Sequence, residues 1–114
     1  MGQERRQFAR VLHPFDVQYR RYGKLGETWQ VVTTLNLSAG GTRFRSEDAL
    51  DTDEILELQI ELPGIRERLM LRGRVTWCHM QASGVTEHGV EFIDVTGEQR
   101  AQIDNLVHFL RKRV

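Results

Sequence analysis

Short runs in which apolar and polar residues alternate dominate this chain of 114 residues. The clearest run, at 56–62, places Leu or Ile at every second position between Glu and Gln residues. A period of two is typical of a strand with one face buried and the other in solvent. Runs of this kind, most of them bounded by Gly or Pro, predict six strands at 15–20, 29–37, 41–45, 56–62, 69–77 and 90–92.

The second run predicts which of its side chains face outward. Its alternate residues would form one apolar face, made of Trp29, Val31, Thr33, Leu35 and Leu37. Asn36 lies between two of them and is therefore expected to point away from the apolar side. By the same period, Trp77 is expected to pack in the core with the other apolar residues of the fifth run.

The last part of the chain changes period. Ile103, Leu106, Val107 and Leu110 follow the spacing of an amphipathic helix. Thr96 followed by Gln99 resembles a capping box, so the helix is expected at about 96–113. Six short strands and one terminal helix predict a mainly β fold, namely a small six-stranded antiparallel barrel whose helix covers an open end or packs outside.

Length and composition indicate one domain and an intracellular home. A chain of 114 residues has the usual size of a single domain. No apolar run approaches the roughly 18 residues of a bilayer span, and the N-terminus leads into no apolar signal segment. The single cysteine, Cys78, agrees with a reducing compartment. We therefore expect a cytoplasmic protein.

Charge is distributed unevenly although the formal net charge is zero. Residues 1–24 carry six basic and two acidic side chains, whereas residues 47–61 carry seven acidic side chains and no basic one. A small basic cluster favours a small anionic ligand at one site over a duplex nucleic acid held along a broad basic face.

Two short polar segments stand out from the strand pattern. Arg5, Arg6 and Arg10 lie in an N-terminal segment without an apolar period, so their charges suit a ligand better than a core. Residues 36–41 combine an amide, a hydroxyl and two glycines in a predicted tight turn; the candidate binding residues there are Asn36, Ser38, Gly40 and Gly41. Short side chains and backbone N–H groups in such a turn can approach a phosphate or a base edge closely.

With both segments in this order ahead of a barrel-like strand pattern, the chain resembles the PilZ domain family, receptors for the bacterial second messenger cyclic di-GMP. Residues 6–10 match the family's R-x-x-x-R, and residues 36–41 match its D/N-x-S-x-x-G. The resemblance covers essentially the whole chain. It implies a split-barrel fold in which residues 1–13 form a flexible arm carrying R-x-x-x-R and residues 14–114 form the barrel with its helix.

The resemblance also implies a role for each motif residue. Arg6 and Arg10 would contact phosphate or guanine from the arm, because a guanidinium is planar, always charged and forked. Asn36 and Ser38 would contact guanine or phosphate on the barrel surface, and Gly41 would permit the turn or a close backbone approach. Many members carry Asp where this chain has Asn36, and an amide is the weaker acceptor for guanine N–H groups.

Arg5 bears on the number of ligands. In the family, an arginine immediately before R-x-x-x-R tends to accompany an intercalated cyclic di-GMP dimer, whose four phosphate charges a third guanidinium would help to balance. The resemblance therefore favours a dimeric ligand here.

Simpler interpretations stay open for each motif. The arginines could be an ordinary solvated charge run, and residues 36–41 could be a hairpin turn and nothing more. The histidines and Cys78 show no recurrent metal-ligand spacing, so no metal is expected. We find no catalytic motif or plausible pair of nucleophile and base, and we expect no enzymatic activity.

We therefore expect a stand-alone cyclic di-GMP receptor that orders residues 1–13 over its ligand and signals to a protein effector. Two other hypotheses belong to different classes. One is a small barrel that binds single-stranded nucleic acid, and the other is an interaction adaptor that works without the ligand. None of the three requires a membrane span or a duplex partner.

Overall fold

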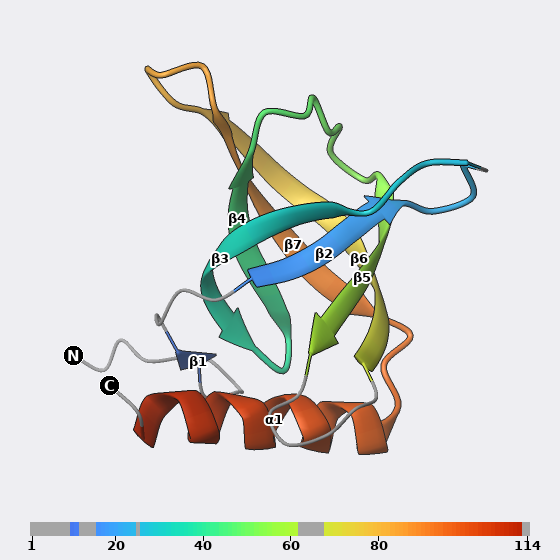
Figure 1. The fold of residues 1–114 in the computed structure, drawn as a ribbon, viewed down its shortest axis with the longest axis vertical. Helices are drawn as coiled ribbons and strands as arrows, with labels where there is room; N and C mark the ends of the chain where they lie inside the picture. Colours follow the sequence, from blue (N-terminus) through green and yellow to red (C-terminus); the bar gives the residue numbers. More distant parts are fainter. Residues whose placement is uncertain (1–9, 12–15, 25, 62–67, 113–114) are drawn as a thin grey trace.

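The computed structural model describes residues 10–11, 16–24, 26–61 and 68–112. In this part of the chain, strands wind around a common interior and one helix lies across an end of it (Figure 1). The elements are β1 (Arg10–Val11), β2 (Asp16–Arg21), β3 (Gln30–Ser38), β4 (Gly41–Ser46), β5 (Ile55–Glu61), β6 (Arg68–Met80), β7 (Thr86–Ile93) and α1 (Gly97–Lys112).

Six of these strands form a closed antiparallel barrel. The order in the sheet is β1-β3-β2-β5-β6-β7-β4, and an additional pairing of β3 with β4 closes β2–β7 on itself. Closure satisfies backbone groups that an open sheet would leave at its edges. The short β1 pairs with the end of β3. The predicted mainly β fold, a six-stranded antiparallel barrel with a C-terminal helix, is confirmed.

Side chains from the inner face of the barrel and one face of α1 make a single core. Tyr19 and Phe44 stack inside the barrel with ring centroids 5.1 Å apart. The spacing of four residues predicted the apolar face of the helix, and all four are buried: Ile103, Leu106, Val107 and Leu110. The helix therefore covers one open end, which was one of the two expected positions.

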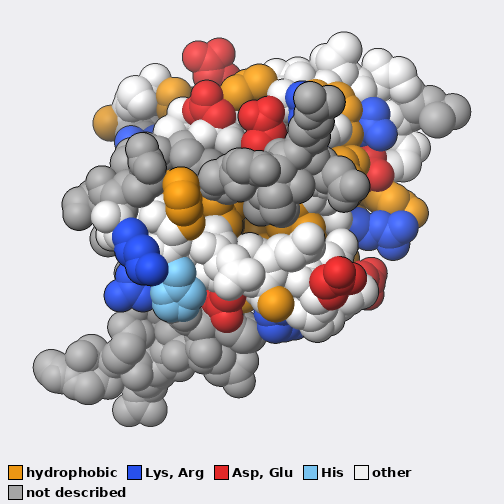
Figure 2. Space-filling view, turned by 60° about the horizontal axis from the view of Figure 1, so that its bottom comes forward, with side chains coloured by type: hydrophobic (Ala, Val, Ile, Leu, Met, Phe, Trp, Pro, Cys, Tyr) orange, Lys and Arg blue, Asp and Glu red, His pale blue; other side chains and the backbone are white. Residues whose placement is uncertain are grey.

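The start of α1 is set by the predicted capping box. The Gln99 N–H donates to Thr96 Oγ1 at 3.1 Å, and the Thr96 N–H donates to Gln99 Oε1 at 3.0 Å. Gln99 Nε2 also donates to the Met70 carbonyl at 3.1 Å, which ties the helix to β6. On this face of the molecule, basic, acidic and apolar side chains of the described residues are interspersed (Figure 2).

A β-bulge changes the alternation within β3. The register with β4 shifts between Thr34 and Asn36. Before the shift, Thr34 is fully buried while Val31 is 62% exposed, so the predicted apolar face through Val31 and Thr33 is wrong there. The extra residue of the bulge reverses the phase. Leu37 is then fully buried, and Asn36 faces outward as predicted.

A second bulge corrects the prediction for Trp77. The register between β6 and β7 shifts between Val75 and Trp77. Val75 is fully buried, but Trp77 is 42% exposed on the outside of the barrel. The expected core position of Trp77 is wrong, because one extra residue in a strand moves every later side chain to the opposite face.

Candidate functional site

The hairpin between β3 and β4 holds the second polar motif. Ser38 pairs with Gly41, which leaves Ala39 and Gly40 as the turn. Ser38 Oγ accepts a hydrogen bond from the Gly40 N–H at 3.1 Å, and the Gly40 carbonyl accepts one from the Phe92 N–H at 3.0 Å. The turn is therefore held by its own serine and tied to β7.

Gly41 is required by close packing of two strands. A Cβ at this position would overlap the backbone carbonyl oxygen of Val90. The missing side chain of Gly41 therefore allows the backbones of β4 and β7 to lie close together. A contact between Gly41 and a ligand stays a prediction.

Strand pairing aligns the motif with residues from the other strands in two rows across the barrel wall. The first row consists of Asn36, Arg43, Gly89 and Trp77. The second row consists of Arg10, Ser38, Gly41, Glu91 and Arg74. Along β3, β4 and β7 the rows are two residues apart, so the residues of these strands share one face.

The two rows border an open pocket of about 330 Å³. This volume lies in the range of about 300–1,000 Å³ that is usual for small-molecule sites. Its lining brings together the four predicted barrel residues and seven others: Asn36, Ser38, Gly40, Gly41, Thr42, Arg43, Thr76, Trp77, Gly89, Val90 and Glu91.

Trp77 supplies the aromatic surface of this pocket. A Cβ on Gly89 would overlap the Trp77 indole, so the ring lies directly against the Gly89 backbone. The glycine makes room for the ring, and the ring remains 42% exposed. An indole held in this way offers a surface on which a nucleic-acid base can stack.

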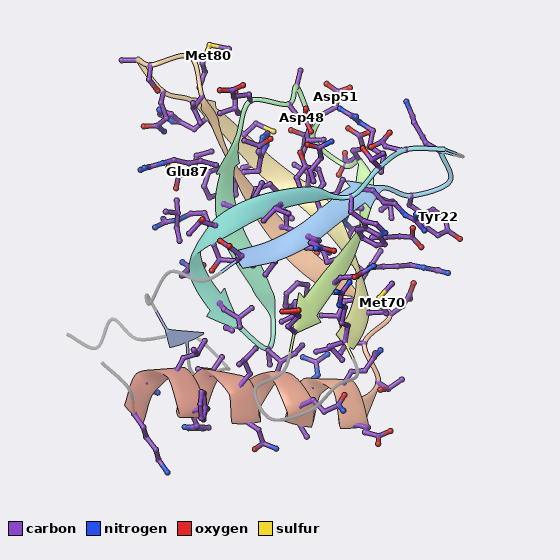
Figure 3. The ribbon with its side chains drawn as sticks, viewed as in Figure 1. Tyr22, Asp48, Asp51, Met70, Met80 and Glu87 are labelled. Atoms are coloured by element: carbon purple, nitrogen blue, oxygen red, sulfur yellow. The ribbon has the colours of Figure 1, made fainter. Side chains whose placement is uncertain are left out.

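Each charged residue that lines the pocket, Arg43 or Glu91, is paired with an oppositely charged residue beside the pocket. Arg43 Nε lies 2.9 Å from Glu87 Oε2, and Arg74 Nη2 lies 3.0 Å from Glu91 Oε1. Glu87 extends outward from this side of the barrel (Figure 3). Because these carboxylates offset the two guanidiniums, a ligand with two phosphate charges would need further cations from elsewhere.

The end of the first polar motif joins the barrel through β1. The backbone of Arg10 pairs with Ser38, and Val11 pairs with Leu37. The segment that carries R-x-x-x-R therefore joins the barrel at the serine of the second motif. Arg5 and Arg6 lie outside the described residues.

A model of the PilZ domain matches residues 4–109. The chain belongs to the PilZ domain family. The matched range contains both polar motifs, the six barrel strands and most of α1. A comparison with curated protein sequences finds no match.

Solved structures of PilZ proteins share the fold of this PilZ domain at low sequence identity. The Bacillus subtilis inhibitor of motility (MotI/DgrA) aligns at a TM-score of 0.69 and 23% identity, over 96% of this chain and 51% of that one. The PilZ domain of CeSA from a cellulose-synthesizing bacterium aligns at 0.66 and 19%, over 90% and 98%. The PilZ domain of Escherichia coli YcgR with c-di-GMP aligns at 0.73 and 13%, over 96% and 94%. The chain thus spans about half of MotI.

Sequence reasoning missed Arg43 and misplaced Trp77. Arg43 could have been found, because a two-residue turn at Ala39–Gly40 pairs Asn36 with Arg43 by simple counting from the hairpin. Trp77 could not, because its place depends on a bulge in β6 that the alternation conceals.

The inner side of β7 carries a buried titratable group. His88 is fully buried, with its ring centroid 5.6 Å from that of Phe44. Neither ring nitrogen makes a hydrogen bond in the described structure. Burial lowers the pKa of His88, and the nearby Asp48 offsets part of this effect. Burial therefore favours the neutral form of this histidine.

The described residues lack two further features. Nowhere in this part of the chain do three His, Cys, Asp or Glu side chains gather as a metal site requires. Within the same residues, no helix has the length and hydrophobicity of a membrane span.

Proposed function

We propose that this PilZ-domain protein is a receptor for cyclic di-GMP that binds its ligand on the outer face of β3, β4, β6 and β7. One observation supports this most. Residues 36–41, which match the family motif, line one pocket with an exposed tryptophan, and the R-x-x-x-R segment joins the barrel beside Ser38. The YcgR PilZ domain, which has the same fold, was solved with c-di-GMP.

Each part of the ligand has a suitable group at this site. A guanine stacks on Trp77, whose indole lies over Gly89. Asn36 and Ser38 offer hydrogen-bonding groups beside it. Arg6 and Arg10 supply the charge that the carboxylate-paired Arg43 and Arg74 do not, and they contact phosphate or guanine O6 and N7.

Arg5 extends the same argument to the number of ligands. Two stacked molecules carry four phosphate charges, and a third arm guanidinium increases the positive charge available to them. We therefore propose that the bound species is an intercalated dimer.

The proposed mechanism is an ordering of the arm, residues 1–13, over the ligand, starting from Arg10 and Val11, which already pair with β3. A ligand that contacts both the arm and the barrel binds their joined arrangement best and so shifts the population toward it. A protein effector in the cytoplasm then reads the new surface. The protein acts as a receptor and not as a catalyst.

Calorimetry of the full chain with cyclic di-GMP tests the proposal, with GTP and a short single-stranded oligonucleotide as separate titrants. We expect saturable heat with the cyclic dinucleotide alone, at two ligands per chain. A ratio of one would contradict the dimer only. Tighter binding of the oligonucleotide would instead identify a nucleic-acid binder, and heat with none of the three would leave an adaptor that works without ligand.

Limited proteolysis tests the ordering of the arm separately. Trypsin cleavage after Arg5, Arg6 and Arg10 should slow at saturating cyclic di-GMP, while amide exchange in β5 stays unchanged. Cleavage at the same rate with and without ligand would contradict the switch even if calorimetry showed binding.

A further inference from the structure

The first half of β3 has an edge that no described strand covers. β3 pairs with β4 only from Thr34 to Ser38, whereas Gln30–Thr33 pair with β2 alone. Across the gap, Arg45 and Ser46 of β4 pair only with β7. The two strands therefore part toward the end of the barrel opposite α1, as the ribbon shows (Figure 1). The β3 bulge, which increases local twist, lies where they separate.

A groove of about 620 Å³ lies between the two separated strands. It is larger than the pocket of about 330 Å³ beside the family motif. The groove is lined by Gln30, Val31, Val32, Thr33, Leu35, Arg45, Ser46, Glu47, Asp48 and Val85. Asp48 marks its position at the end of the molecule far from the helix (Figure 3).

The free edge of β3 has a composition that favours pairing with another strand. Residues 30–35 read Gln-Val-Val-Thr-Thr-Leu, without a charge, a glycine or a proline. Proteins usually protect free strand edges with proline or with charged side chains, above all lysine. Residues 30–33 contain neither. In an antiparallel strand every second residue directs its N–H and C=O to each edge. Val31, 62% exposed, adds an apolar side chain beside this edge.

We propose that this groove binds an extended peptide segment of a partner protein by strand addition. The peptide pairs with the free edge of Gln30–Thr33 and places alternate apolar side chains against Val31, Leu35 and Val85. An edge of this length takes about four to six peptide residues at about 3.3 Å per residue.

A single extended segment fits the groove better than a second copy of this barrel. The β3 of a second copy is already joined to β2, so its barrel would have to enter between the separated strands with it. A peptide has both edges free and can reach β3 without that obstacle.

The charges along the groove indicate the composition of the peptide. Glu47 and Asp48 follow β4, and the nearby Arg45 lies 3.8 Å from Glu87 Oε1. Glu47 is exposed and makes no ion pair with another described residue. A Lys or Arg at the end of the peptide that meets Glu47 completes the match.

The groove and the motif pocket share no lining residue. The proposal therefore does not rest on cyclic di-GMP binding, and its test contains no nucleotide. Its failure would leave the receptor proposal untouched.

A phage-displayed library of random peptides tests the groove. Its peptides have about ten residues, roughly twice a typical strand length. Panned against the full chain, the library should enrich peptides with alternating apolar residues and a Lys or Arg. Synthetic copies should bind Val31→Lys at least about tenfold more weakly, because a lysine protects an edge. Glu47→Lys should also weaken binding. Met80→Lys, at the end of β6 and outside the groove lining (Figure 3), should not weaken binding.

Amide exchange of the wild-type chain gives a second readout that does not depend on a variant. Bound peptide should protect amides within residues 30–33. Failure to enrich any peptide, peptides that bind Val31→Lys unchanged, or protection elsewhere would overturn the proposal. Self-association of the chain that Val31→Lys abolishes would also overturn it, because the groove would then belong to a second copy.

Discussion

The two halves of β3 present different surfaces because their backbone groups pair with different numbers of strands. From Leu37 to Ser38 the strand is paired with β1 on one side and β4 on the other. From Gln30 to Thr33 it is paired with β2 alone. The doubly paired half presents Ser38, with Asn36, which is paired with β4, directly before it. The singly paired half presents an uncharged edge and Val31.

This difference shows how one strand can serve two kinds of partner. Pairing on both edges holds the backbone, so short polar side chains keep their positions for a small ligand. An unpaired edge leaves backbone donors and acceptors free for another chain. The bulge separates the two halves of β3. The predictions on Gly41, the arm arginines and Trp77 test whether the doubly paired half and the strands beside it form a fixed platform for a ligand, and the prediction on His88 tests the barrel interior.

The largest effect should come from breaking the platform itself. Gly41→Val would place a branched side chain against the Val90 carbonyl and push β4 away from β7. We expect the free energy of unfolding to fall by about 3 kcal/mol or more, measured by urea denaturation.

Gly97→Ala is the matched control, because a Cβ there would have nothing within 4 Å. It should leave the denaturation midpoint nearly unchanged. A Gly41→Val chain as stable as the wild type would show that the β4–β7 contact is not tightly packed.

The next effect should appear in binding and not in stability. Arg6→Ala and Arg10→Ala should each weaken cyclic di-GMP binding by about 1.5–3 kcal/mol, the range for hydrogen bonds to charged groups, as calorimetry would show. The ligand-free melting temperature should stay the same. Arg111→Ala, which removes an equal charge from the last turn of α1, is the control and should bind normally. If both arm variants bind cyclic di-GMP with full affinity, the barrel residues bind the ligand without the arm arginines.

Trp77→Ala should weaken the same binding by about 1–3 kcal/mol, the usual loss when one stacked base loses its aromatic partner. Trp77→Phe should lose less. Gly89→Ala should resemble Trp77→Ala, because its Cβ would displace the indole from the strand. If Trp77→Ala binds as tightly as the wild type, the Trp77 indole does not stack on the ligand.

The smallest effect concerns His88, which pairs with Phe44 at the level where β3 and β4 separate. Burial lowers its pKa below the ordinary value of 6.5. Below about pH 6.5 the unfolded chain therefore binds a proton that the folded chain resists, so stability should fall as pH drops from 7 to 5. Above that pH His88 should contribute no pH dependence.

His88→Leu should flatten this part of the profile of unfolding free energy against pH. The comparison with the wild type removes the contributions of the carboxylates, which both proteins share. Equal slopes between pH 7 and 5 would mean that His88 is accessible to protons in the folded barrel.

Several features of the fold followed from local patterns. The alternation at 56–62 predicted β5, and the Thr96–Gln99 pair predicted where α1 begins. The alternation misled in the first part of β3 and at Trp77, because a bulge adds one residue without any clear mark in the sequence. Register and face can therefore be predicted only as far as the next bulge.

The sequence by itself determined the local elements, the family and the two polar motifs, because strand period, helix capping and motif spacing are properties of neighbouring residues. Only the tertiary structure decided that Gly89 and Trp77 lie in one row with Asn36, and that β3 keeps a free edge before Thr34. These facts depend on the register between strands far apart in the chain. Closure of the barrel and the positions of its bulges set that register, and no local pattern encodes it.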